Sequence, residues 1–539
     1  MSGPDLEQVV IALRSGQTNA ASGMLQAILA DDPDNFDAGW LLLQCLEAQR
    51  NRDAAAEQLD RLAVRSAGRP GDLDRLAQFA YQHGLSLAAV IRAMERHREA
   101  RPENLDALFN RAFYLARAAR YEEAIGCYRE AIRRGIQAPE QAELNIASIY
   151  MDHLHDPGRA RKHIDNARRL NPRAPAVYQN LGTLAEQLGD RVLATRAFEK
   201  CLELQPDNHA ILARLADAHR FTDPGDPLLE RLERAVPSSP GADLHFALGR
   251  AYDQLRQYDA AWRHFRLAND RDARRFPPYE PDRAEEMFAE IARTPTTPIP
   301  ASTDAPSAAP VFICGLFRSG STLLEKILGA HGSFVATGES EFFPRLMARH
   351  LPYYPEGLEH VTDEDLQDWR DAYLGATREL TGGGRIIDKR PENFLIAGLI
   401  RAILPEARFI VTERDPRDMA VSNFATRLNP RQVYATRLAH IRHYLALHRR
   451  LVEHWESVLE GSLVRIPYES LVREPRATLE PLLNWLGEDW DDACLDFHAT
   501  GDAVRTVSAW QVREPLHDRS IGRWRNYSGP VGEVFDAGS

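Results

Sequence analysis

The sequence lacks several features that mark specialised classes of protein. No run of about eighteen apolar residues occurs among its 539 residues, so we expect no membrane-spanning helix. The start of the chain, MSGPDLEQVVIALRSGQ, lacks the basic-then-apolar order of a secretory signal, and we therefore predict a cytoplasmic protein. The five cysteines lie far apart without a CxxC pair, which indicates reduced thiols rather than disulfides or a zinc site.

Acidic residues outnumber basic residues, with 78 Asp and Glu against 66 Lys and Arg. The formal net charge of −12 argues against a nucleic-acid partner, although a basic pocket can lie inside an acidic surface. No cluster of metal-ligating residues occurs at a metal-site spacing, and the histidine-bearing run Arg437–Trp455 has the period of a solvated helix face, so we predict no metal. The chain is too long for one core, and we expect two to four domains.

The first half of the sequence repeats a pattern of paired amphipathic segments. In APAVYQNLGTLAEQLGDRVLATRAFEKCLELQPDN, Leu181, Gly182 and Ala185 fall on one face of a first helix, and Ala194 and Phe198 fall on one face of a second. Small residues at such positions let two helices approach closely. The pattern resembles the tetratricopeptide repeat, and we predict six to eight copies stacked as an all-α superhelix that binds a protein or peptide.

The pattern changes after the repeats. Residues 1–275 form the predicted superhelix, and residues 276–309 form a predicted Pro-rich linker with few contacts. Its last part, Ala292–Pro310, is rich in Pro, Ser, Thr and Ala. In residues 310–539, short apolar strands such as PVFICGL, RIIDK and ARFIVTERD alternate with helices. This alternation predicts an α/β domain with a central parallel sheet covered on both faces.

A glycine-bounded loop, GLFRSGST, follows the first of these strands and opens a helix. Such a loop directs backbone N–H groups and a helix N-terminus at one point, where a phosphate is stabilised. Gly315, Gly320 and Thr322 hold the places expected in a nucleoside-triphosphatase loop, but Ser321 stands where the lysine should be. The positive charge lies instead at Arg318, whose guanidinium suits one phosphate or sulfate group at short range.

A second phosphate site is predicted at the end of another strand. In ARFIVTERDPRDMAVSNF, Arg414 ends the strand and Ser422 follows one turn into the next helix. Two phosphate sites on adjacent strands, without a triphosphate loop, fit 3′-phosphoadenosine 5′-phosphosulfate.

Five motifs occur in the order found in the sulfotransferase family: RSGST, DKRPENF, RDPRDMAVS, YESLVREP and VSAWQVREPLHDRSIGRWRNY. The sequence most resembles bacterial proteins that fuse tetratricopeptide repeats to a sulfotransferase domain, and it is also similar to protein-tyrosine sulfotransferases. The resemblance implies that Arg414 and Ser422 bind the 3′-phosphate. It implies that the 5′-phosphosulfate is bound by Arg318, Ser319, Gly320, Ser321 and Thr322.

The resemblance also implies a catalytic base in VATGESEFFPRL. Counting from the loop gives Glu339, while Glu341 would point to the same side if a short strand continued through this segment. We favour Glu339 and keep Glu341 as the alternative. His331, at the end of the loop helix, is a third candidate, because other sulfotransferases use histidine.

Three further residues take roles from the resemblance. Lys389 would neutralise the transferring group together with Arg318, and Ser508 would donate to the bridging oxygen. Arg523 replaces a lysine that binds the cofactor phosphate, which keeps the charge but changes the geometry.

Two other functions compete with a sulfotransferase. A P-loop kinase would need the loop lysine, which is absent, and a repeat scaffold with an inactive domain would not need the whole set of predicted site residues. The sulfate acceptor stays open between a peptide, a carbohydrate, a lipid and a small phenol. The sequence also allows a homodimer.

Overall fold

The fold is described from a computed structural model, which covers residues 5–294, 309–381, 384–429, 431–499 and 510–536. The chain divides into two compact units. Residues 1–180 with 344–352 form the first, and residues 181–343 with 353–539 form the second. The division falls inside helix α11.

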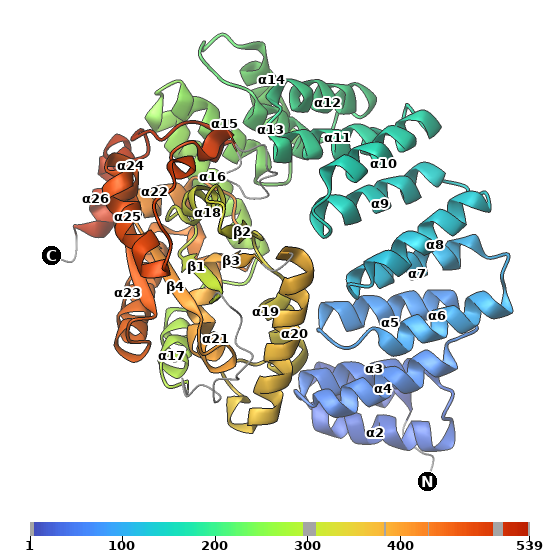
Figure 1. Ribbon diagram of the computed structural model, residues 1–539. Helices are drawn as coiled ribbons and strands as arrows, with labels where there is room; N and C mark the ends of the chain where they lie inside the picture. The colour runs from blue at the N-terminus through green and yellow to red at the C-terminus, as the bar shows by residue number, and fades with distance from the viewer. Residues whose placement is uncertain (1–4, 295–308, 382–383, 430, 500–509, 537–539) are drawn as a thin grey trace. The chain divides into compact units, whose positions relative to one another are not determined.

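Sixteen helices of the repeats follow one another as pairs, which confirms the predicted all-α repeats (Figure 1). None of the described helices combines the length and apolar character needed to cross a bilayer. The bounds are α1 Leu6–Arg14, α2 Thr18–Asp31, α3 Phe36–Ala48, α4 Arg52–Arg65, α5 Pro70–Gln82, α6 Ala88–Ala100, α7 Leu105–Arg117, α8 Tyr121–Arg133, α9 Pro139–Asp152, α10 Pro157–Leu170, α11 Pro175–Leu188, α12 Arg191–Leu204, α13 His209–Ala218, α14 Pro227–Ala235, α15 Asp243–Gln254 and α16 Tyr258–Arg275.

Asparagine residues between the pairs act as helix caps. Asn35, Asn104 and Asn208 each end a Pro-Asp-Asn or Pro-Glu-Asn sequence and stand directly before α3, α7 and α13. Each side chain accepts a hydrogen bond from the backbone N–H three residues later, at 3.0–3.1 Å. The cap satisfies an N–H group that the helix itself leaves unpaired, so these asparagines fix where the three helices begin.

Glycine allows the close approach of paired helices. A Cβ atom at Gly182 of α11 would lie 2.2 Å from the ring of Phe198 in α12, and one at Gly249 of α15 would lie 2.4 Å from the ring of Phe265 in α16. Both rings are fully buried. The predicted role of the small residue at Gly182 is confirmed, and Gly249 has the same role.

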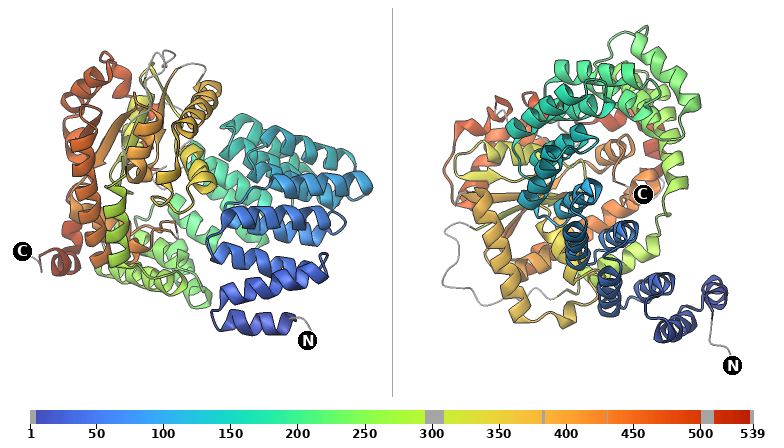
Figure 2. Two further views of the ribbon diagram at one scale, coloured as in Figure 1. Left: turned by 90° about the horizontal axis from the view of Figure 1, so that it is seen from below. Right: turned by 90° about the vertical axis from the view of Figure 1, so that its right-hand side faces the viewer.

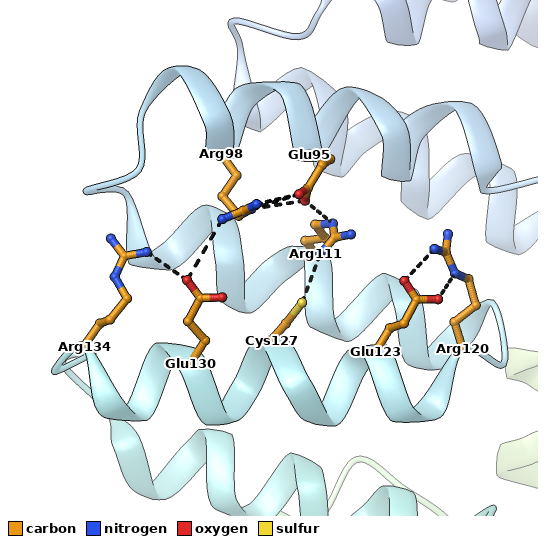
Figure 3. A network of polar contacts seen from close by, with 8 residues as sticks. All are labelled: Glu95, Arg98, Arg111, Arg120, Glu123, Cys127, Glu130 and Arg134. Carbon is orange, nitrogen blue, oxygen red and sulfur yellow. Dashed lines mark hydrogen bonds and ion pairs between the residues drawn. The ribbon is translucent and has the colours of Figure 1, made fainter.

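Ion pairs join neighbouring helices in the first unit (Figure 3). Glu95 of α6 accepts from Arg98 on its own helix at 2.6 Å and pairs with Arg111 of α7 at 2.8 Å. Arg111 also donates to the thiol of Cys127 in α8 at 2.9 Å. The hydrogen bond from Arg98, and then the charge of Arg111, lower the pKa of Glu95 against the opposing effect of its burial. These contacts link three successive helices through one arginine.

The second unit contains a five-stranded parallel sheet in the order β2-β3-β1-β4-β5, as predicted. The strands are β1 Val311–Gly315, β2 Phe334–Ala336, β3 Arg385–Lys389, β4 Arg408–Glu413 and β5 Leu463–Pro467. The remaining helices are α17 Pro281–Ile291, α18 Ser321–Gly329, α19 Phe342–His350, α20 Asp363–Thr381, α21 Ala397–Ile403, α22 Pro416–Phe424, α23 Leu438–Val458, α24 Tyr468–Arg473, α25 Pro475–Leu486 and α26 Ser528–Phe535, with a short 3₁₀ helix, η8, at Arg523–Tyr527.

Both faces of the sheet are covered, because alternate side chains of β1 point to opposite sides. Val311 and Ile313 pack in a core with α18 and α25. Phe312 faces the other way. The centre of its ring lies 5.6 Å from the centre of the Phe409 ring and 6.0 Å from that of the Tyr373 ring in α20. Figure 2 shows helices on both sides of the strands. The carboxyl ends of β3, β1 and β4 therefore share one open edge.

The last helical pair shares a core with the α/β domain. Phe246 of α15 and Phe265 of α16 pack in one buried cluster with Phe424 of α22 and Tyr527 of η8. Within the predicted linker, residues 281–291 form α17, which packs against α23. The expectation of few contacts between the two parts therefore does not hold for α15–α17, and the contact division at residue 180 differs from the predicted boundary at 275. The apolar face of the last helical pair packs against the α/β domain. The periodicity of the repeats cannot predict this contact, because it shows only which face is apolar.

The close packing at Gly249 predicts that Gly→Ala substitutions at Gly249 and Gly375, both in the second unit, change the stability in opposite directions. Gly249→Ala should lower the free energy of unfolding by about 1–3 kcal/mol, because the methyl group displaces a buried ring. Gly375→Ala is the matched control, since Gly375 lies exposed in α20 with no atom within 4 Å of a Cβ, and alanine should add about 0.5–1 kcal/mol. Urea unfolding followed by circular dichroism measures both. Equal stability of the two variants would contradict the packing argument.

Candidate active site

The loop between β1 and α18 depends on three residues with positive φ. Gly315 has φ +140°, Arg318 +72° and Gly320 +104°. A Cβ atom on Gly315 would lie 2.7 Å from the carbonyl oxygen of Thr412. One on Gly320 would lie 2.7 Å from the ring of Tyr468, so only glycine fits at either position. Arg318 is not glycine, and its left-handed conformation costs of order 1–3 kcal/mol. Such strain persists where the surrounding structure imposes it, as at binding sites.

The loop leads into the N-terminus of α18. Gly320 is the N-cap and supplies no side-chain hydrogen bond, so the helix begins with its N–H groups and positive dipole end directed at the loop. Ser321 and Thr322 form the first turn and line a pocket there. This arrangement is suited to an anion.

Three arginines from distant parts of the chain line the same pocket. Arg318 comes from the loop, Arg414 from the end of β4 and Arg523 from η8. Burial, and then the charges of Arg414 and Arg523, lower the pKa of Arg318 to about 10. Burial also lowers the pKa of Arg414. The pocket therefore concentrates positive charge on partly buried side chains, where an anion is bound more strongly than in open water.

Each of these side chains is held by further contacts. Arg318 Nε donates to Ser422 Oγ at 3.1 Å, and Arg414 Nη1 donates to the Arg318 carbonyl oxygen at 3.3 Å. Arg414 Nη2 donates to the carbonyl oxygen of Ser520, and its guanidinium lies 4.8 Å from the centre of the Tyr468 ring. Arg414 Nε is buried without a hydrogen-bond partner in the described part of the chain. A donor left over in this way fits a site that receives an anionic oxygen.

The residues predicted to bind the donor come together here, with one exception. The pocket is lined by Arg318, Gly320, Ser321, Thr322, Leu323, Arg414, Ser422, Tyr468, Val472, Val512, Glu514, Pro515, Leu516, His517, Ser520 and Arg523. Ser319 is not among them. Its hydroxyl is buried against Thr412 Oγ1 at 2.6 Å, and its N–H donates to the Leu316 carbonyl oxygen at 3.2 Å, so its side chain joins the loop to β4.

A buried lysine stands at the neighbouring strand end. Lys389 is the last residue of β3 and is 0% exposed, yet its Nζ donates to Glu339 Oε1 at 2.7 Å and lies 3.9 Å from Glu325 Oε2. Glu339 is 38% exposed at its side chain. The structure thus brings together the predicted base and the predicted cation. An open α/β sheet presents such groups to a ligand at the carboxyl ends of its strands.

Glu325 was missed in the sequence. It lies in α18, and its burial raises its pKa against the opposing charge of Lys389, while the backbone N–H of Gly338 donates to it. The signal was an acidic residue within the apolar run STLLEKIL, which places a carboxylate on a buried helix face. Glu325 joins α18 to the turn that carries Glu339.

The alternative bases have other partners. The expected strand does not reach Glu339 or Glu341, because β2 ends at Ala336 and Gly338 turns the chain with φ +71°. Glu341 pairs with Arg390 at 2.5 Å and points to solvent.

The third candidate base, His331, has other partners as well. His331 accepts from the Ser333 N–H at 3.2 Å and contacts the Asp489 carbonyl oxygen at 3.0 Å, so both ring nitrogens are engaged. Ser508 lies outside the described residues.

Comparison with known proteins shows which families the chain resembles. A family profile described as "Sulfotransferase family" matches residues 310–492, and profiles described as "Tetratricopeptide repeat" match residues 12–70 and 175–208. The chain is 29% identical over 402 residues to a protein of Aquifex aeolicus (strain VF5) called "Uncharacterized protein", covering 69% of this chain and 52% of that protein.

Two further similarities are to proteins that are named as sulfotransferases or sulfotransferase domains. It is 28% identical over 233 residues to "Protein-tyrosine sulfotransferase 1" of Danio rerio, covering 40% of this chain and 65% of that protein. The chain thus spans about half to two thirds of the length of these relatives. The sulfotransferase domain from the Synechococcus PCC 7002 olefin synthase matches with 21% identity and a TM-score of 0.34, covering 42% of this chain and 90% of that domain. The chain thus joins regions that match tetratricopeptide-repeat profiles to a region, residues 310–492, that matches the sulfotransferase family.

Proposed function

We propose that the pocket binds 3′-phosphoadenosine 5′-phosphosulfate and that the α/β domain transfers its sulfuryl group to a hydroxyl acceptor. The convergence of Arg318, Arg414 and Arg523 on one pocket at the N-terminus of α18 carries this proposal. A donor with a 5′-phosphosulfate and a separate 3′-phosphate supplies anionic groups for all three guanidiniums. The family supports sulfuryl transfer at a general level.

Each end of the donor has its own set of groups. The first turn of α18 and the Arg318 guanidinium hold the 5′-phosphosulfate, since backbone N–H groups and a helix dipole favour a compact anion. Arg414 and Ser422 hold the 3′-phosphate. The Ser422 hydroxyl accepts from Arg318, and its own O–H remains available as a donor to a phosphate oxygen.

The reaction needs a base and stabilisation of negative charge. The acceptor oxygen attacks sulfur, the bond from sulfur to the bridging oxygen breaks, and 3′-phosphoadenosine 5′-phosphate leaves. Glu339 takes the acceptor's proton on the carboxylate that Lys389 holds in place. Lys389 and Arg318 stabilise the charge on the transferring group, and Ser508 donates to the bridging oxygen.

Tyrosine in a peptide is the first acceptor to test, because of the similarity to the Danio rerio enzyme. The repeats would recruit the protein that carries it, and we propose a cytoplasmic location. Incubation with labelled donor and a cell extract identifies the acceptor fraction. A parallel incubation with labelled ATP tests the alternatives: a P-loop kinase would transfer phosphate there, and a scaffold with an inactive domain would transfer neither group.

The separate 3′-phosphate site predicts the nucleotide preference. The protein should bind 3′-phosphoadenosine 5′-phosphate about ten- to over a hundredfold more tightly than AMP, because a charge-assisted contact contributes about 1.5–3 kcal/mol. Ser422→Ala should reduce this preference, whereas Ser457→Ala, on the exposed end of α23, should preserve it. Isothermal titration calorimetry measures each affinity. Equal affinity of the wild type for AMP, ATP and the bisphosphate would rule out two phosphate sites.

The contrast between the two glutamates predicts which one is the base. Glu339→Gln should reduce the single-turnover rate by about 10²–10⁴, the usual contribution of general base catalysis, and leave donor affinity unchanged. Glu341→Gln is the control, because Glu341 pairs with Arg390 at the surface. Rapid-quench measurements with the identified acceptor give both rates. Normal turnover by Glu339→Gln would remove this residue from the mechanism, and loss of turnover only in Glu341→Gln would assign the base to Glu341.

A further inference from the structure

Arg523 is held by a carboxylate from the repeats. Its Nη2 lies 2.9 Å from Oδ2 of Asp253, which is in α15 of the last helical pair. The hydroxyl of Tyr527, at the other end of η8, donates to Oδ1 of the same aspartate. Both side chains of the ion pair are about four-fifths buried. Both carboxylate oxygens of Asp253 therefore bind side chains of η8, the segment that supplies Arg523 to the pocket.

The charges around Arg523 make this contact important. Arg318 and Arg414 carry the same charge and line the same pocket, so they repel a third guanidinium. Burial would lower the pKa of Arg523, but Asp253, with Tyr527, raises it overall. A guanidinium has five N–H donors in a planar fork, so one edge can pair with Asp253 while another faces an anion.

The backbone of η8 is fixed independently of Asp253. Asp418 of α22 accepts from the N–H of Gly522 at 2.6 Å and from the N–H of Trp524 at 2.8 Å. These bonds hold the main chain on both sides of Arg523. Loss of Asp253 should therefore release the Arg523 side chain while the segment that carries it stays in place.

A second contact ties the same helical pair to the pocket. Asn269 of α16 is buried, and its side-chain amide donates to the carbonyl oxygen of Phe424 at 2.8 Å. Phe424 ends α22, two residues after Ser422. Arg427 pairs with Asp243 of α15 at 2.5 Å and with Asp272 of α16 at 3.1 Å. The last helical pair thus supports two separate groups of the pocket, Ser422 and Arg523.

We propose that Asp253 is a positioning residue of the donor pocket, so that the last helical pair of the repeats is part of the donor-binding site. It holds the Arg523 guanidinium beside Arg318 and Arg414, where the anionic donor needs it. The inference rests on the proposed function, because it takes the pocket ligand to be the donor nucleotide. It differs from that proposal in assigning part of the site to the repeats.

The test compares variants of the full chain for binding of 3′-phosphoadenosine 5′-phosphate by isothermal titration calorimetry. Asp253→Asn keeps the shape but removes the charge, and it should weaken binding about tenfold or more. Asp270→Asn is the matched control. Asp270 of α16 pairs with Arg437 at 2.6 Å, which joins the same helical pair to the α/β domain, but neither residue lines the pocket. This variant should bind like the wild type.

A double-mutant cycle separates positioning from a general loss of structure. If Asp253 acts through Arg523, Asp253→Asn should have little further effect in an Arg523→Ala background. Additive losses would overturn the proposal, as would unchanged or tighter binding by Asp253→Asn, which would mean that the carboxylate only reduces the positive charge of the pocket. Equal weakening by Asp270→Asn would assign the effect to helix docking and also overturn it.

Two further outcomes keep the test decisive. If Asp253→Asn does not fold, as judged by circular dichroism, Asp253→Glu keeps the charge and moves it by one methylene, and it should weaken binding by less than the loss in Arg523→Ala. Wild-type affinity in Asp253→Glu would then overturn the proposal. Failure of the wild-type chain to bind the nucleotide would overturn the proposed function as well, whereas wild-type binding with no effect at Asp253 would overturn only this inference.

Discussion

Three like-charged guanidiniums at one partly buried pocket are the constraint on which the second unit depends. Arg318, Arg414 and Arg523 reach it from the loop after β1, from the end of β4 and from η8. Burial of each charge is unfavourable, and their mutual repulsion adds to the cost. The fold compensates with specific partners: the Ser422 hydroxyl, two backbone carbonyl oxygens, the Tyr468 ring and the carboxylate of Asp253. An anion with two charged groups would complete this compensation.

This constraint links the two kinds of architecture in the chain. The parallel sheet places the ends of β1 and β4 side by side, so that the loop arginine and Arg414 meet without help from the repeats. The third arginine comes from η8, which packs on α15 and α16 in the shared apolar core. The last helical pair therefore contributes both packing and a carboxylate. This arrangement gives a physical reason why α15 and α16 belong to the same compact unit as the sheet.

The sequence predicted most of the site because its signals are local. The loop glycines, Arg318 and Ser321 lie within one strand-loop-helix segment, and the alternation of strands and helices places Arg414 and Lys389 at the same sheet edge. The helical pairs, of which six to eight were predicted, were likewise readable from the recurring small residues, such as Gly182, that let paired helices approach closely.

The parts that the sequence did not predict depend on tertiary contacts. Asp253 lies within an ordinary repeat helix, and nothing in its neighbourhood in the sequence marks a partner 270 residues later. In the sequence, Glu325 has the spacing of a polar residue on an amphipathic helix. Its role is visible only in the fold, which places Lys389 beside it. Ser319 matches a binding motif, but its hydroxyl faces Thr412 because the loop turns at Arg318.

A crystal structure of the full chain with 3′-phosphoadenosine 5′-phosphate tests the central claim most directly. Our account predicts that the nucleotide lies in the pocket of the three arginines. Its 5′-phosphate should contact the first turn of α18 and Arg318, and its 3′-phosphate should lie within hydrogen-bonding distance of Arg414 and Ser422. A nucleotide bound elsewhere, or one whose 3′-phosphate points to solvent away from Arg414, would contradict the account.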